Sequence, residues 1–156
     1  MATGVHNIID DFLAQKRIAF VGVSRNPRSF SRKLFHEFRS RGYDVVPVNL
    51  AASDIDGLAC YLRTQDIQPP VDAVLLMTSR EASYRALIDC QEAGVRRVWT
   101  YGVRGPRQAS AGAVEFCAAH QIALVPGYCP FMFLPNSGFF HRFHGRIMKV
   151  MGSYPS

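Results

Sequence analysis

The turn at residues 22–33 carries the groups best suited to bind an anion. A lone glycine, Gly22, ends an apolar run, and a basic segment follows it. The polar side chains of this turn are those of Ser24, Arg25, Asn26, Arg28, Ser29, Ser31 and Arg32. Either Ser29 or Ser31 could cap a helix, whose first N–H groups would then face a ligand. A strand, a turn and a helix N-terminus in this order collect phosphates. The alternative is an ordinary strand-to-helix turn with solvated arginines.

The net charge of +6 is concentrated around this turn. Eight Lys or Arg lie between Lys16 and Arg41, against one acid, Glu37. Three interpretations stay open: a solvated helix face, a phosphorylated small ligand, or nucleic acid. Nucleic acid is disfavoured and is not expected as a partner, because no zinc-finger pattern or RNP-type aromatic motif accompanies the charge.

The turn departs from the common nucleotide-binding motifs. A dinucleotide fold would show GxGxxG after the first strand, and here Gly22 is followed by Ser24. Asn49 ends the second strand, where a nicotinamide enzyme has an acid for the ribose, and Asp54 and Asp56 come several residues later. No GxxxxGK[ST] loop occurs either. NAD and ATP hydrolysis are therefore disfavoured.

Length and composition indicate one soluble domain. The chain has 156 residues, of which 48% are apolar and 19% charged. Its four cysteines form no CxxC pair, and Asp10 and Asp11 interrupt the segment where a secretory signal would lie. No apolar run approaches the ~20 residues of a membrane span. We expect a cytoplasmic protein with free thiols and no transmembrane segment.

Apolar runs alternate with helical patterns along the chain. The expected strands are residues 18–23, 44–49, 71–78, 97–102 and 122–125. The expected helices begin at Val5 with Thr3 as cap, in the turn after Ser29, at Ala82 and at Ser110, with a short one at residues 58–63. Continuous apolar strands between helices predict an α/β fold, a three-layer, Rossmann-like, doubly wound parallel sheet. We expect the order 3-2-1-4-5, with the ligand crevice at the carboxyl ends beside strand 1. Pro47 predicts an edge position or an irregularity.

Several segments together resemble the stand-alone CoA-binding domain family, which is similar to the N-terminal domain of the succinyl-CoA synthetase alpha chain. The segments are Ala19–Ser24, Pro27, Ser31, Gly42–Asn49, Val71–Val74, Gly94–Val95, Val98–Trp99, Gly102 and Cys129–Pro130. Their order and spacing are more specific than any one of them. We therefore expect a CoA-binding domain over residues 1–130 and an aromatic, basic extension over 131–156.

The resemblance implies a small-molecule ligand, CoA or acyl-CoA, bound without complete catalytic machinery. The residues it places at the ligand are Gly22, Val23, Ser24, Arg25, Asn26, Pro27, Arg28, Ser31, Asn49, Thr78, Ser79 and Gly102. Arg80 is a further candidate phosphate contact. An NAD(P)-type oxidoreductase, a CoA-linked transferase that uses Cys129, or a regulatory interaction module are the alternatives.

Two features of the last 30 residues have competing interpretations. Cys129 precedes Pro130 and is either a nucleophile or a buried, inert thiol. His141 and His144 could join Cys129 in a partial zinc site, but no fourth ligand is evident, and we expect no metal. These histidines fit better on an amphipathic helix whose apolar stripe is Phe140, Phe143, Ile147 and Met151. That stripe could pack on the domain, form a homodimer contact or lie on an anionic membrane.

Overall fold

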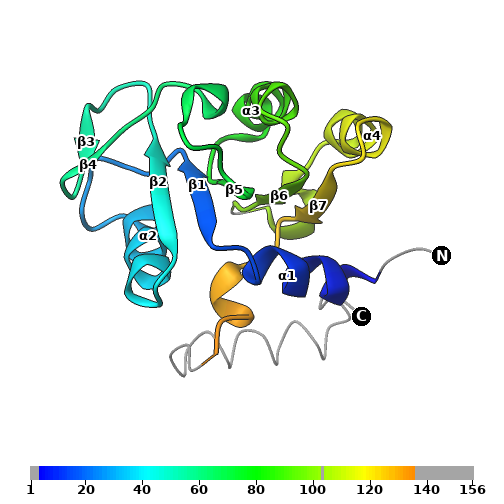
Figure 1. The fold of residues 1–156 in the computed structure, drawn as a ribbon. Helices are drawn as coiled ribbons and strands as arrows, with labels where there is room; N and C mark the ends of the chain where they lie inside the picture. Colours follow the sequence, from blue (N-terminus) through cyan, green and yellow to red (C-terminus); the bar gives the residue numbers. More distant parts are fainter. Residues whose placement is uncertain (1–3, 103, 136–156) are drawn as a thin grey trace.

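A computed structural model describes residues 4–102 and 104–135. Within them, one parallel sheet is covered by helices on both faces (Figure 1). Its strands are β1 (Arg17–Val21), β2 (Asp44–Val48), β5 (Ala73–Leu76), β6 (Arg97–Thr100) and β7 (Ala123–Pro126). The α-helices are α1 (Val5–Leu13), α2 (Phe30–Ser40), α3 (Arg80–Glu92) and α4 (Ala111–Ala119). The predicted α/β, Rossmann-like class is confirmed.

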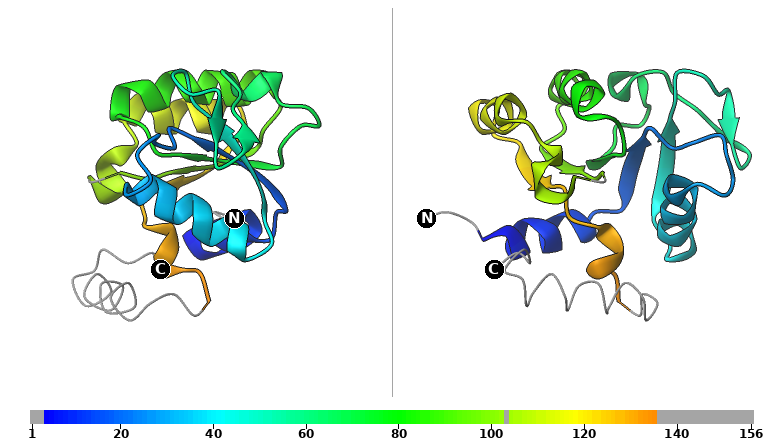
Figure 2. Two further views of the ribbon diagram at one scale, coloured as in Figure 1. Left: turned by 90° about the vertical axis from the view of Figure 1, so that its left-hand side faces the viewer. Right: turned by 180° about the vertical axis from the view of Figure 1, so that it is seen from behind.

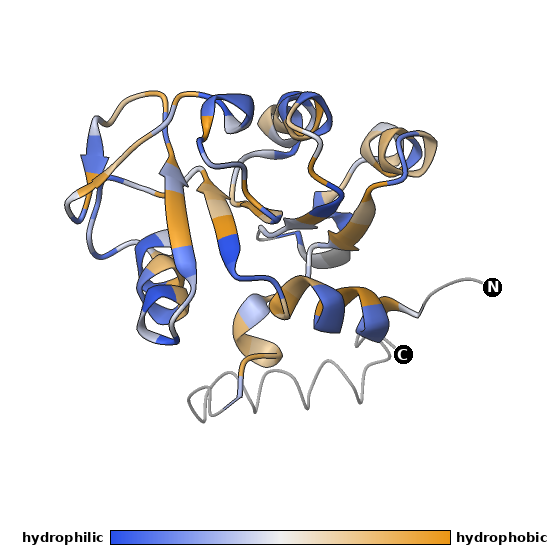
Figure 3. Ribbon diagram, in the orientation of Figure 1, coloured by the Kyte–Doolittle hydropathy of each residue, from blue (hydrophilic) through white to orange (hydrophobic). Residues whose placement is uncertain are grey.

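Two apolar layers hold the sheet between its helices. α1 and α2 pack on one face, and α3 and α4 pack on the other (Figure 2). Phe12 of α1, Phe35 of α2 and Trp99 of β6 meet in the first layer. Leu87 of α3 and Cys117 of α4 belong to the second. Apart from β6, the strands are apolar for most of their length, because helices cover both faces (Figure 3).

The strand order corrects our expectation of 3-2-1-4-5. The observed order is β2-β1-β5-β6-β7, so the third main strand, β5, pairs with β1 instead of lying outside β2. Pro47 explains the difference. It has no N–H to donate toward the free edge of β2, so a full ladder there would lose a hydrogen bond. Among the described residues, Tyr61 alone bridges that edge: its N–H donates to Pro47 O and its carbonyl accepts from Asn49 N. The predicted edge position of this strand is confirmed.

A hairpin replaces the helix expected at residues 58–63. Strands β3 (Asp54–Ile55) and β4 (Leu58–Ala59) pair antiparallel, and a 3-10 helix, η1 (Thr64–Asp66), follows. Asp56 and Gly57 form the turn with φ of 51° and 78°. Asp-Gly between two short apolar runs favours a tight hairpin, a signal that outweighed the helical spacing.

Serine caps set the start of three helices. Ser29, Ser79 and Ser110 each accept a hydrogen bond from the backbone N–H three residues later. Ser29 is therefore the cap of α2, whereas Ser31 lies inside the helix. α3 begins at Arg80, two residues before the expected start. Gly4 occupies the N-cap position of α1, and Thr3 lies outside the described residues.

After β7 the chain passes to the face that α1 and α2 cover. The indole N–H of Trp99 donates to the Tyr128 carbonyl at 2.7 Å. The 3-10 helix η3 (Pro130–Met132) follows, and Leu134 is buried in the same core. The predicted C-terminal helix, with His141 and His144, lies outside the described residues. Among the described helices, none has the length and apolar character needed to cross a membrane.

Candidate functional site

The carboxyl ends of β1, β2 and β5 converge on Gly22. Its φ is +87°, and its N–H donates to the Val48 carbonyl at 3.1 Å. A Cβ placed on it would lie 2.6 Å from the Met77 carbonyl oxygen and 2.8 Å from Thr78 Cγ2. The position requires glycine both for its left-handed conformation and for the close approach of the next strand. Gly22 thus allows the segments that follow β1 and β5 to approach closely.

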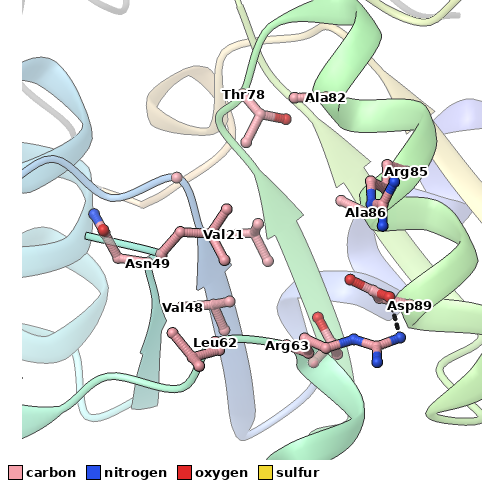
Figure 4. A pocket seen from close by; sticks show the side chains of 13 residues that line it. Val21, Val48, Asn49, Leu62, Arg63, Thr78, Ala82, Arg85, Ala86 and Asp89 are labelled. Atoms are coloured by element: carbon pink, nitrogen blue, oxygen red, sulfur yellow. Dashed lines mark hydrogen bonds and ion pairs between the residues drawn. The ribbon is translucent and has the colours of Figure 1, made fainter. Parts of the chain in front are cut away.

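The larger cavity of this region opens between the sheet and α3, with a volume of about 670 Å³ (Figure 4). Apolar side chains make most of its walls: Val21, Val48, Leu50, Leu62, Ala82 and Ala86. Asn49 and Thr78 lie at one end, and Gly22, which packs against Thr78, also lines the cavity. Arg63 and Asp89 form an ion pair at the other end. The cavity therefore combines apolar walls with polar groups at both ends.

A second cavity of about 450 Å³ lies on the other side of Thr78, which lines both. The first turns of two helices open onto it. Phe30 and Ser31 come from α2, and Ser79, Arg80 and Glu81 come from the start of α3. Helix N-termini carry partial positive charge and free N–H groups, so two of them at one cavity favour a bound anion.

Arg80 adds a full positive charge to this second cavity. Its Nε is buried and has no hydrogen-bond partner among the described residues. Buried polar groups are nearly always paired, so an orphan donor at a cavity wall needs an explanation. The Arg80 guanidinium therefore has an unpaired donor in a residue that lines the cavity. Arg104 lines the same cavity and is exposed.

The basic turn is held by its own hydrogen bonds. Ser31 Oγ accepts from the Ser24 N–H at 2.9 Å, and Ser24 Oγ accepts from the Asn26 N–H at 3.0 Å. Asn26 Oδ1 accepts in turn from the Arg28 N–H at 3.0 Å. Ser24 and Ser31 therefore shape the loop. Their hydroxyl groups already make hydrogen bonds within the loop.

Arg32 is a structural residue and not a free phosphate contact. Its side chain is buried, and its guanidinium donates to the carbonyls of Ser24 and Arg25 and pairs with Asp56. His36 also contacts Asp56, at 2.9 Å. Asp56, in the turn of the β3–β4 hairpin, thus ties this hairpin to α2 and the basic turn. Arg25 is exposed beside Arg32, in a polar cavity of about 400 Å³.

Asn49 joins the ends of the first two strands. Its Nδ2 donates to the Val23 carbonyl at 2.8 Å, and its Oδ1 accepts from the Ala51 N–H at 2.6 Å. Figure 4 shows the amide directed away from the cavity that the residue lines. Asn49 therefore positions the loops around the cavity.

Gln108 is a site residue that the sequence did not reveal. It is buried in the 3-10 helix η2 (Gly105–Gln108), and its Nε2 donates to the Thr78 carbonyl at 3.0 Å. Its amide fills the space where a Cβ on Gly102 would lie. Gly102 thus allows Gln108 to join the ends of β5 and β6. In the sequence, Gly102 is the one feature that indicates this contact.

Cys129 is a buried thiol with 8% exposure, close to Tyr101. Burial raises its pKa above the ordinary value, although hydrogen bonds from Phe131, Tyr101 and Met132 act in the opposite direction. Burial, with Cys129 adding to it, likewise raises the pKa of Tyr101 to about 12. A protonated thiol is a weak nucleophile, so this environment suits an inert cysteine better than a catalytic one.

The remaining predicted ligand contacts are spread over different surroundings. Val23 is fully buried, so its side chain belongs to the core. Asn26, Pro27 and Arg28 are exposed on the turn, outside the cavities described above. Ser79 and Gly102 line the second cavity together. Of the twelve residues that the resemblance placed at the ligand, seven border one of the three cavities: Gly22, Arg25, Ser31, Asn49, Thr78, Ser79 and Gly102. The further candidate, Arg80, borders the second cavity.

Comparison with known proteins adds an independent observation. The sequence model of a family described as CoA binding domain matches residues 16–135. The alpha subunit of an ADP-forming acetate–CoA ligase II of Pyrococcus furiosus is 27% identical over 92 residues. That alignment covers 58% of this chain but 20% of the ligase subunit.

Two solved structures share the fold. A hypothetical protein of Pyrococcus horikoshii aligns with a TM-score of 0.72 and 21% identity over 94% of both chains. A dinucleotide-forming acetyl-coenzyme A synthetase of Ca. Korarchaeum cryptofilum aligns with a TM-score of 0.61 and 22% identity. The second alignment covers 72% of this chain and 26% of the synthetase. The fold therefore occurs both in a protein of this length and within a longer enzyme.

Proposed function

We propose that this chain, which belongs to the CoA binding domain family, binds CoA or an acyl-CoA at the carboxyl ends of β1, β5 and β6. The observation that carries the proposal is the second cavity, where the first turns of α2 and α3 meet beside the unpartnered Arg80 Nε. CoA bears a pyrophosphate and a 3′-phosphate. Two helix N-termini and an arginine match such an anion.

The adjoining apolar cavity suits the uncharged part of the ligand. It meets the second cavity at Thr78, so one extended ligand could occupy both. Arg25 and Arg28 stand exposed on the turn between the strand and α2, within reach of a phosphate outside the crevice. Arg28 is our candidate for the 3′-phosphate.

Binding without a complete catalytic apparatus is the activity we infer. The chain spans 20% of the length of its curated relative, so that enzyme's reaction is not carried over. Cys129 has a raised pKa and little exposure, which argues against a thiolate nucleophile. Four cysteines without disulfides fit a reducing cytoplasm, where CoA keeps its free thiol.

Isothermal titration calorimetry with CoA and 3′-dephospho-CoA tests the proposal. We expect saturable binding of CoA below millimolar concentration. Arg28→Ala should weaken CoA more than dephospho-CoA, because one charged hydrogen bond contributes about 1.5–3 kcal/mol. Arg96→Ala is the matched control: Arg96 is exposed, contacts Gln121 and precedes β6, at the opposite end of the sheet. Absence of binding at millimolar CoA would refute the proposal.

A further inference from the structure

The larger cavity ends on a carboxylate. Asp89, on α3, lies at the end of this cavity opposite Thr78 (Figure 4). We propose that the cavity holds the purine base of an adenine nucleotide and that Asp89 recognises the 6-amino group of that base. The inference rests on the proposed function, in which the nucleotide is CoA, and it assigns a residue that determines base specificity.

The hydrogen bonds of Asp89 leave one oxygen unused. Its Oδ1 accepts from Arg63 Nη2 at 3.1 Å and from Gln65 Nε2 at 3.2 Å. No donor among the described residues contacts Oδ2, and 22% of the side chain is exposed. Arg63 and Gln65 thus hold the carboxylate in one orientation and leave an acceptor at the cavity wall. An ionised carboxylate only accepts hydrogen bonds, so it selects a ligand that donates.

The walls of the cavity favour a flat, uncharged group. Val21 and Val48 come from the sheet, Leu62 from the segment before η1, and Ala82 and Ala86 from α3. Apolar walls with a few placed polar groups are typical of small-molecule sites. Arg63, which is paired with Asp89, and Arg85 also line this cavity. The two helix N-termini that attract phosphates lie beyond Thr78, at the second cavity. The apolar walls and the free acceptor of Asp89 therefore suit the base, and the two helix N-termini at the second cavity suit the phosphates.

Adenine and hypoxanthine differ in the hydrogen bond that Asp89 would make. The 6-amino group of adenine donates, while the 6-oxo group of hypoxanthine only accepts. A carboxylate facing the 6-oxo group loses a charged hydrogen bond and leaves two acceptors opposed. Such an unpaired contact costs about 1.5–3 kcal/mol, so we expect a preference of about tenfold or more for the 6-amino base.

Calorimetry with two ligand pairs tests the assignment. The pairs are CoA with its hypoxanthine analogue, and AMP with IMP. Asp89→Asn should reduce the preference to less than about threefold, because an amide can also donate to the 6-oxo group. Glu92→Gln is the matched control. Glu92 Oε2 also binds Arg63, at 3.2 Å, and Gln65, at 2.9 Å, but Glu92 does not line the cavity, so the preference should persist.

A fold defect in Asp89→Asn would be seen as a lowered melting temperature, and Asp89→Glu then takes its place. The glutamate keeps an acceptor-only group and should keep the sign of the preference. Equal affinity of the wild-type chain for both members of each pair overturns the base assignment while CoA binding stands. Preference for AMP over IMP without CoA binding supports the assignment and contradicts the proposed function. Absence of binding by all four ligands overturns both.

Discussion

Gly22 and Met77 are in such close contact that a Cβ on Gly22 would lie 2.6 Å from the Met77 carbonyl oxygen. The Met77 N–H donates to the Val21 carbonyl at 2.8 Å, so the two chain segments approach through their backbones. This contact lies where the two larger cavities meet. The spacing of the strand ends, and with it the shape of the candidate site, depends on the missing side chain at residue 22.

Gly22→Ala should destabilise the domain more than Gly42→Ala. Both glycines have φ near +90°, at +87° and +89°, so both variants bear the cost of the left-handed conformation, about 1–2 kcal/mol. Only Gly22 has atoms within 4 Å of the added Cβ. We expect an additional loss of about 1–3 kcal/mol in the free energy of unfolding, measured by urea denaturation. Equal losses in the two variants would contradict the close-contact account.

Asn49→Ala should loosen the loops after β1 and β2. The variant removes a donor to Val23 O and an acceptor for Ala51 N–H in a partly buried position. We expect a loss of about 1–3 kcal/mol in the free energy of unfolding, measured in urea. Asn26→Ala is the comparison, because Asn26 makes a similar turn bond but is exposed. A smaller effect at residue 49 than at residue 26 would argue against a positioning role.

Arg80→Gln should weaken CoA binding about tenfold at low ionic strength. The change removes the charge whose Nε lacks a partner at the second cavity, and a charged hydrogen bond contributes about 1.5–3 kcal/mol. The difference between the variant and the wild type should shrink as salt rises, because screening weakens partly exposed charges. Calorimetry at two salt concentrations measures both effects. Unchanged affinity at low salt would exclude Arg80 from the site.

Cys129 should react slowly with iodoacetamide at neutral pH. Burial raises its pKa above the ordinary value of 9.0, so less thiolate is present at pH 7 than in the unfolded chain. The rate should rise as the pH increases above 9. Tyr101→Phe removes a hydrogen bond that lowers this pKa, so it should slow the reaction further. Mass spectrometry of the labelled peptide reports the rate. Labelling at pH 7 as fast as in urea would instead indicate an activated thiol.

Local signals in the sequence predicted the strands and most helix starts, although α3 begins two residues before the expected Ala82. Continuous apolar runs located the five strands of the sheet, and Ser29, Ser79 and Ser110 precede helices as cap chemistry requires. Local signals did not predict the strand order. It depends on the side of β1 to which the segment after Leu50 returns, and this is decided by Pro47 and Tyr61 at the sheet edge. The Asp56-Gly57 turn was a local signal that the helical interpretation overlooked.

The site was predictable where it follows strand ends. Gly22, Asn49, Thr78 and Gly102 come within two residues of strand ends, so the topology of a parallel sheet brings them to one edge. Asp89 and Gln108 escaped prediction for a physical reason. Each reaches the site from a helix, through packing that only the folded chain creates.

The central claim is that CoA binds at the carboxyl ends of the strands. Amide chemical shifts of 15N-labelled protein, recorded while CoA is added, test it most directly. The account predicts saturable shifts at Gly22, Thr78 and Gly102, with little change at Gly42 and Gly94, which precede β2 and β6 at the opposite end of the sheet. Unchanged spectra at millimolar CoA, or shifts confined to the Gly42 and Gly94 end, would contradict it.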